Sequence, residues 1–238
     1  MIDRRTVLAG AIISPLLSMS AAAQVPTGLA IGFAPPLNID LFSVTRTSVA
    51  AGSVGVVTLS VTRRYRFARN GRGYTLTSEI ADMSDDAPPE LSHRLRANLT
   101  PLSGMQLGFL LTDHGALFAL SDETSAMLAL QNSVATTVDG GPSSPMLQSI
   151  AAMTPEQQHA LLFNEARDLT RFAGQQVQNA VLVADMAVIE QPESENSPLR
   201  LRARVHAVSG LSWLIERTAD PAHIPHHGVV ATRMELRA

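Results

Sequence analysis

The clearest pattern of apolar and polar positions lies in residues 58–80, TLSVTRRYRFARNGRGYTLTSEI. Asn70-Gly71 is a strong signal for a two-residue hairpin turn, because both central positions of a type I′ turn need a positive φ. A turn centred on this pair places Phe67 opposite Tyr74 and Tyr65 opposite Leu76. One face of the predicted hairpin is then apolar and aromatic, with Tyr65, Phe67, Tyr74 and Leu76, while Arg64 and Arg66 lie on the other face.

A second clear alternation is LRLRARVHA, residues 199–207. Leucine, alanine and valine occupy one face, and Arg200, Arg202, Arg204 and His206 occupy the other, which is typical of a half-buried strand. A second hairpin is predicted in residues 104–120, with its turn at Asp113-His114-Gly115. Further strands are predicted at residues 38–47, 181–190, 211–218 and 228–237.

Between these β regions, the pattern predicts a helical insert over about residues 121–174. Its best helix begins at Thr154-Pro155-Glu156-Gln157, a capping box with proline at the first helical position. Leu162, Ala166, Leu169 and Ala173 share one face of this helix, and Gly174 is its predicted stop.

The order of strands, helices and strands predicts an α+β protein: a curved, antiparallel, half-barrel-like β-sheet with the helical insert packed on one face. This order of elements resembles the periplasmic lipoprotein-carrier fold. The resemblance implies a curved sheet wrapped over its helices, and it rests on no shared motif.

Residues 1–23 have a different character from the rest of the chain. Arg4 and Arg5 precede an uncharged run from Val7 to Met19, and Ala21-Ala22-Ala23 follows. The order basic, apolar, small is typical of a secretory signal peptide, so we expect a cut before Gln24. Residues 24–238 then form a single mature β-rich domain.

The stretch Asp3-Arg4-Arg5-Thr6-Val7-Leu8 resembles the bacterial twin-arginine export motif. The resemblance covers only residues 1–23. It implies that the protein folds in the cytoplasm and crosses the membrane folded, with the export machinery and signal peptidase as partners. General secretion is the alternative route, and either route predicts a periplasmic or secreted protein.

Composition narrows the chemistry that the chain can perform. All 18 basic residues are arginine, which excludes a lysine Schiff base and a phosphate-loop lysine. Cysteine is absent as well, so thiol nucleophiles and zinc–thiolate sites are excluded. The net charge of −3 argues against nucleic acid as a partner, because its backbone is bound mainly by clustered positive charge.

Three groups of residues are candidate sites. His223, His226 and His227 lie within five residues and could ligate a metal ion, although a solvated loop explains them as well. Arg200, Arg202 and Arg204 could meet an anionic surface, although a solvated strand face is the simpler interpretation. Tyr65, Phe67, Tyr74 and Leu76 would face an apolar ligand if the curved sheet formed a cradle.

These observations leave two classes of function open. The first, which we favour, is an exported envelope protein without enzymatic activity that binds an apolar ligand or serves as a scaffold. The second is a metal-dependent periplasmic enzyme that uses the histidine cluster in the last inter-strand loop. The sequence identifies no cofactor, and none of the familiar nucleophile motifs occurs in it.

Overall fold

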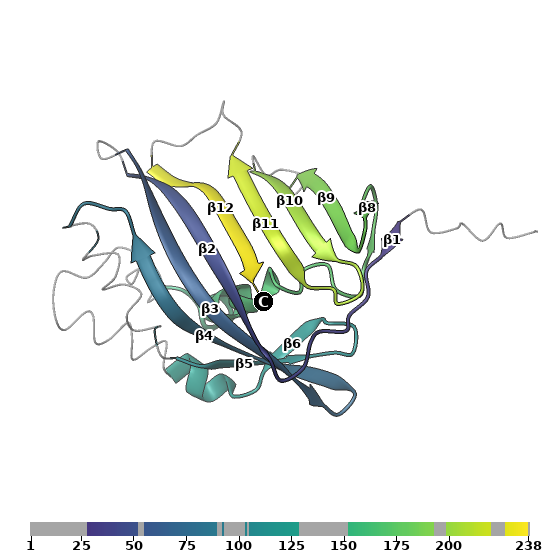
Figure 1. Ribbon diagram of the computed structural model, residues 1–238. Coiled ribbons are helices and arrows are strands. Elements are labelled where there is room, and N and C mark those ends of the chain that lie inside the picture. Colours follow the sequence, from purple (N-terminus) through teal and green to yellow (C-terminus); the bar gives the residue numbers. More distant parts are fainter. Residues whose placement is uncertain are drawn as a thin grey trace, which may run out of the picture.

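The computed structural model of the protein describes residues 28–51, 55–89, 92, 103, 105–128, 152–192, 199–219 and 227–237. These residues form a ten-stranded antiparallel sheet in the order β6-β5-β4-β3-β2-β12-β11-β10-β9-β8, together with a two-stranded sheet, β1-β7 (Figure 1). The strands are β1 Leu29–Ala30, β2 Asp40–Ala51, β3 Val56–Asn70, β4 Gly73–Asp85, β5 Leu107–Leu111, β6 Leu117–Leu120, β7 Gln176–Val177, β8 Val181–Val183, β9 Met186–Pro192, β10 Leu199–His206, β11 Ser212–Ala219 and β12 His227–Arg237.

The large sheet is strongly curved but does not close, so β6 and β8 are its two edges (Figure 1). Its middle is the antiparallel pair β2 and β12, which joins the first long strand to the last. The predicted antiparallel curved sheet is therefore confirmed. The helical content is lower than an α+β fold implies, since the described helical residues are α4, Pro155–Arg167, the segment 123–128, and residues 89 and 92.

The hairpin β3–β4 has the predicted faces but not the predicted register. Asn70 pairs with Gly73, so the turn residues are Gly71 and Arg72, and only Gly71 has a positive φ, 58°. Glycine at the first central position is typical of a type II′ turn. Phe67 therefore lies opposite Leu76, two residues from the predicted partner. Because a shift of two preserves the side-chain alternation, every aromatic side chain remains on the core face.

A β-bulge interrupts the regular pairing of the same hairpin. Arg63 pairs with Ile80, and Thr62 pairs with Asp82, so Ala81 is the extra residue of β4. Beyond the bulge, Val61 pairs with Met83. A bulge increases the local twist of the strands, and here it lies in the two longest strands of the curved sheet.

The predicted capping box of α4 is confirmed. The Gln157 amide donates to Thr154 Oγ1 at 3.3 Å, and the Thr154 amide donates to Gln157 Oε1 at 2.9 Å. The helix ends earlier than predicted, at Arg167 with Asp168 as its C-cap, and the chain continues through turns to Gly174, whose φ is 67°. Leu162, Ala166 and Leu169 are buried as predicted.

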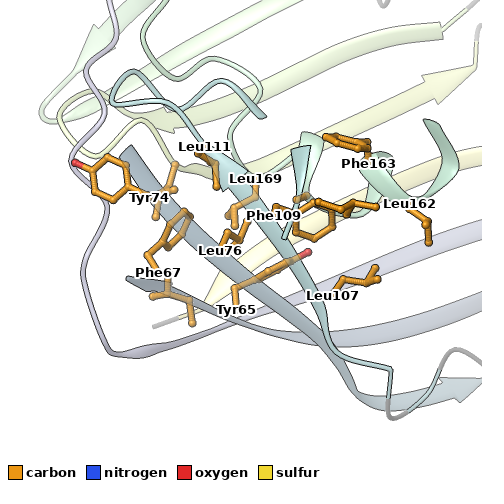
Figure 2. Close-up of a cluster of buried hydrophobic side chains, with 14 of the residues drawn as sticks. Tyr65, Phe67, Tyr74, Leu76, Leu107, Phe109, Leu111, Leu162, Phe163 and Leu169 are labelled. Carbon is orange, nitrogen blue, oxygen red and sulfur yellow. The ribbon is translucent and has the colours of Figure 1, made fainter. Parts of the chain in front are cut away.

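The main core cluster lies between α4 and strands β3 to β6 (Figure 2). Phe67, Leu76, Phe109 and Leu169 have no exposed surface, and the rings of Phe109 and Phe163 meet edge to face at 6.0 Å. A second cluster is formed by strands β9 to β12 together with Ile31, Phe172 and Val177. Both clusters lie on the same side of the large sheet, which we call the core face; the opposite side is the outer face.

The predicted strand at residues 181–190 is two strands. Val183 pairs with Met186 across a tight turn at Ala184-Asp185, and Ala184 has a positive φ of 53°. The sequence gives no turn signal here, because alanine rarely adopts this conformation. Strand β8 therefore folds back along β9 and becomes the edge of the sheet.

None of the helices in the described part of the chain is long and apolar enough to cross a membrane.

Candidate functional site

An ion pair fastens the end of α4 to the core face of the sheet. The guanidinium of Arg217, on β11, donates to both carboxylate oxygens of Asp168, at 2.7 and 2.5 Å. The side chains are 16% and 27% exposed, and Arg171 lies 3.9 Å from the same carboxylate. The Ser212 amide also donates to the Leu169 carbonyl at 2.9 Å. Two-point contacts of this kind define one position for the end of the helix.

The phenol of Tyr65 is the main polar group inside the first core cluster. Burial raises its pKa above the usual value, and this effect outweighs the opposing influence of Arg63 and of the nearby Ser43 and Ser78 hydroxyls. No described group meets those two hydroxyls with hydrogen-bond geometry, although the phenol lies beside them. Because the phenol stays protonated at neutral pH, it is not a nucleophile or general base there.

The outer face carries a ladder of ion pairs that runs across several strands. Its members within 4.0 Å include Arg64–Glu79, Arg66–Asp40, Arg46–Glu235, Arg233–Glu216 and Arg202–Glu190. Most of the guanidinium groups of this face therefore have a carboxylate partner. Exposed pairs such as these contribute little to stability, so the ladder mainly sets the charge pattern of the face.

The predicted arginine row of β10 lies on the outer face, as expected, but its three members are not equivalent. Arg202 Nε is 3.1 Å from Glu190 Oε1. Within the described residues, Arg200 and Arg204 have no carboxylate within 4.0 Å. Arg64 and Arg66, on β3, are on the same face, but three strands lie between β3 and β10. They also have acidic partners of their own, so the two rows do not form one positive band.

An open hollow of about 690 Å³ lies over strands β9, β10 and β11. Arg200, Arg202, Glu190, Glu216 and Thr218 are among its lining residues. Since Arg202 is paired with Glu190 and Glu216 is paired with Arg233, Arg200 is the lining cation that no described carboxylate neutralises. The hollow therefore presents one available guanidinium beside groups that can donate and accept hydrogen bonds.

The four candidate ligand-facing side chains, Tyr65, Phe67, Tyr74 and Leu76, all lie in the first core cluster and are at most 5% exposed (Figure 2). Leu162 and Leu169 of the helical segment belong to the same cluster. A ligand could reach these side chains only if the helix moved aside. Their assignment to a ligand cradle therefore stays a prediction.

The histidine cluster cannot be placed. His223 and His226 lie outside the described residues, and only the backbone of His227, the first residue of β12, is described. Among the side chains that are described, no group of three metal-ligating residues occurs. The metal site of the alternative enzyme therefore stays a prediction.

Two features of the site could not be found in the sequence. Asp168 and Arg217 are far apart in the chain, and neither belongs to a local motif. The hollow depends on which arginines find carboxylate partners on neighbouring strands, and this follows from the register of β9, β10 and β11.

Comparisons with known proteins identify no family. No protein-family model matches the chain, and no curated protein matches it. A search of solved structures finds a domain from Vibrio parahaemolyticus described as an outer membrane lipoprotein-sorting protein, with 9% sequence identity and a TM-score of 0.21. The alignment covers 83% of this chain and 84% of that one. A TM-score of this size does not identify a shared fold.

Proposed function

We propose that the chain is an exported, non-enzymatic binding domain of the bacterial envelope, and that it binds an anionic ligand in the outer-face hollow through Arg200. The observation that carries this proposal is the one lining cation without a described carboxylate partner, set in a hollow within the roughly 300–1,000 Å³ range of small-molecule sites.

The chemistry of the hollow favours a carboxylate or a phosphate as the charged group of the ligand. A guanidinium presents two parallel N–H donors to either group, and these hydrogen bonds are stronger than neutral ones. Glu190 and Glu216 add acceptors nearby, which suit hydroxyl or amine groups on the same ligand. The filled core face supports binding on this side, because there an apolar ligand would have to displace α4.

Arg200→Gln should weaken binding of an anionic probe at least about tenfold, because it removes a charge-assisted hydrogen bond. We would titrate the mature protein with inorganic phosphate and, separately, with oligogalacturonate, and follow backbone amide shifts by NMR. The matched control is Arg204→Gln, which removes an arginine of the same strand and face that also has no described carboxylate partner and does not line the hollow.

The control variant should change the affinity less than about twofold, since an exposed charge at this distance is screened by salt. Phosphate and oligogalacturonate distinguish the two charged groups. Absence of saturable binding by the unaltered protein, or an equal loss in both variants, would contradict the proposed site.

Export is tested separately from binding. The intact mass of the protein recovered from a periplasmic fraction should show Gln24 as its first residue. Replacing Arg4 and Arg5 by lysine should abolish export if the twin-arginine route is used, and export that continues would indicate general secretion. Recovery of only the full-length chain in the membrane would contradict an exported, cleaved protein.

A further inference from the structure

Strand β8 is an edge strand whose side chains are all apolar and all exposed. Val181, Leu182 and Val183 are 62%, 51% and 59% exposed. The strand pairs with β9 and ends the strand order of the described sheet (Figure 1). Within the described residues, no strand pairs with its second backbone edge.

The usual protections of a sheet edge are missing from this strand. Proteins block edges with charged side chains, proline or bulges. Strand β8 has no charge and no proline, and its pairing with β9 is regular. The opposite edge differs, because the pairing of β6 with β5 is interrupted by a register irregularity and Leu120 is buried.

The two faces of β8 continue the two faces of the sheet. Leu182 lies opposite Ala187, which is fully buried in the second core cluster, so an added strand would extend that core. Val181 and Val183 lie opposite Val188 and Met186 on the outer face. An occupant must thus supply apolar side chains on both of its faces, together with backbone hydrogen bonds.

We propose that this occupant is a second copy of the chain, joined by antiparallel pairing of β8 with β8 about a two-fold axis at Leu182. This axis sets Val181 against Val183 of the second copy and Leu182 against its own equivalent. A second β8 strand therefore supplies the apolar side chains on both faces and the backbone hydrogen bonds that the first one needs. Such self-complementarity is the condition for an isologous interface.

The residues that flank β8 are compatible with this symmetry. The same axis brings Asn179 toward Asp185 of the second copy, so an amide donor and a carboxylate approach each other, and no two like charges do. Asn179 and Ala184 both have a positive φ, which limits the new ladder to residues 181–183 and their immediate neighbours. A ladder this short predicts a weak dimer whose population rises with protein concentration.

The chain contains no cysteine, which permits a direct test by cross-linking. In an antiparallel pair, opposed Cα atoms are about 4.5–5.5 Å apart, a separation that a disulfide can span. Mature protein carrying Leu182→Cys should oxidise to a covalent dimer in high yield. Phe118→Cys is the matched control, because Phe118 is a 60% exposed apolar residue on the opposite edge strand.

Sedimentation of the unaltered mature protein should show a monomer–dimer equilibrium, and Leu182→Arg should weaken the dimer at least about 100-fold. A monomer at every concentration would overturn the proposal. Equal cross-linking through residues 118 and 182 would also overturn it, as would a dimer that Leu182→Arg leaves intact. Binding of unaltered monomer to lipid vesicles, abolished by Leu182→Arg, would instead assign the edge to a membrane surface.

Discussion

Tyr65→Ala is expected to lower the free energy of unfolding by about 3–5 kcal/mol, as is typical when a large buried ring is removed from a core. The side chain is 1% exposed and belongs to the cluster beneath α4. Truncation leaves a cavity and also removes the phenol that lies beside Ser43 and Ser78. Urea unfolding followed by circular dichroism would measure the change, with the m-value as a check for two-state behaviour.

Tyr65→Phe is the control for this experiment, because it retains the ring and removes only the hydroxyl. It should cost less than about 1.5 kcal/mol, the net worth of an ordinary hydrogen bond. Similar losses in the two variants would show that the hydroxyl, and not the packing of the ring, holds this part of the core together.

The same protein samples test the ligand cradle. The four aromatic and apolar side chains are packed under α4. We therefore expect that the native protein shows no saturable binding of an environment-sensitive apolar dye. Saturable uptake by the native, monodisperse protein, with competition by a fatty acid, would establish the cradle and with it the ligand-facing role of Tyr65, Phe67, Tyr74 and Leu76.

Asp168→Ala is expected to destabilise the protein by about 2–3 kcal/mol, because it leaves the guanidinium of Arg217 largely buried without its carboxylate. The pair is not fully buried, so we place the loss below that of a deeply buried ion pair. Thermal or urea unfolding would measure it. The double variant Asp168→Leu, Arg217→Met should recover part of the loss, since it removes both charges.

Glu190→Ala provides the comparison for this ion pair. Glu190 pairs with Arg202 on the outer face, where the two side chains are 67% and 50% exposed, so its removal should cost less than about 1 kcal/mol. If the two alanine variants lost the same stability, the contact between Asp168 and Arg217 would not be what fixes the end of α4.

The alternation of apolar and polar side chains along the strands made most of the large sheet predictable from the sequence. Strand β10 is the simplest case: Leu201, Ala203 and Val205 are buried, while Arg200, Arg202 and Arg204 are exposed. The turn residues of the first hairpin were wrong, yet its faces were right, because a shift of two residues leaves each side chain on the same side of the sheet. The capping box likewise located the start of α4, since its signal is local.

The remaining features depend on contacts that no local pattern encodes. The bulge at Ala81 and the tight turn at Ala184 are set by neighbouring strands, and neither residue is a typical turn or bulge former. The partners of Arg202 and Arg217 come from other elements, so their roles appear only when the strands are in register. The candidate binding site was therefore predictable as a row of arginines but not as a hollow with one available cation.

The pairing of β2 with β12 in the middle of the sheet has a consequence for the order of folding. Strands β2 to β6 can form a meander from local contacts, but the long free edge of β2 has no partner until β12 has been synthesised, almost the whole described length of the chain later. Contacts between such distant segments slow folding and prolong the lifetime of species with exposed strand edges. We therefore expect that the nascent chain depends on chaperones until β12 completes the sheet.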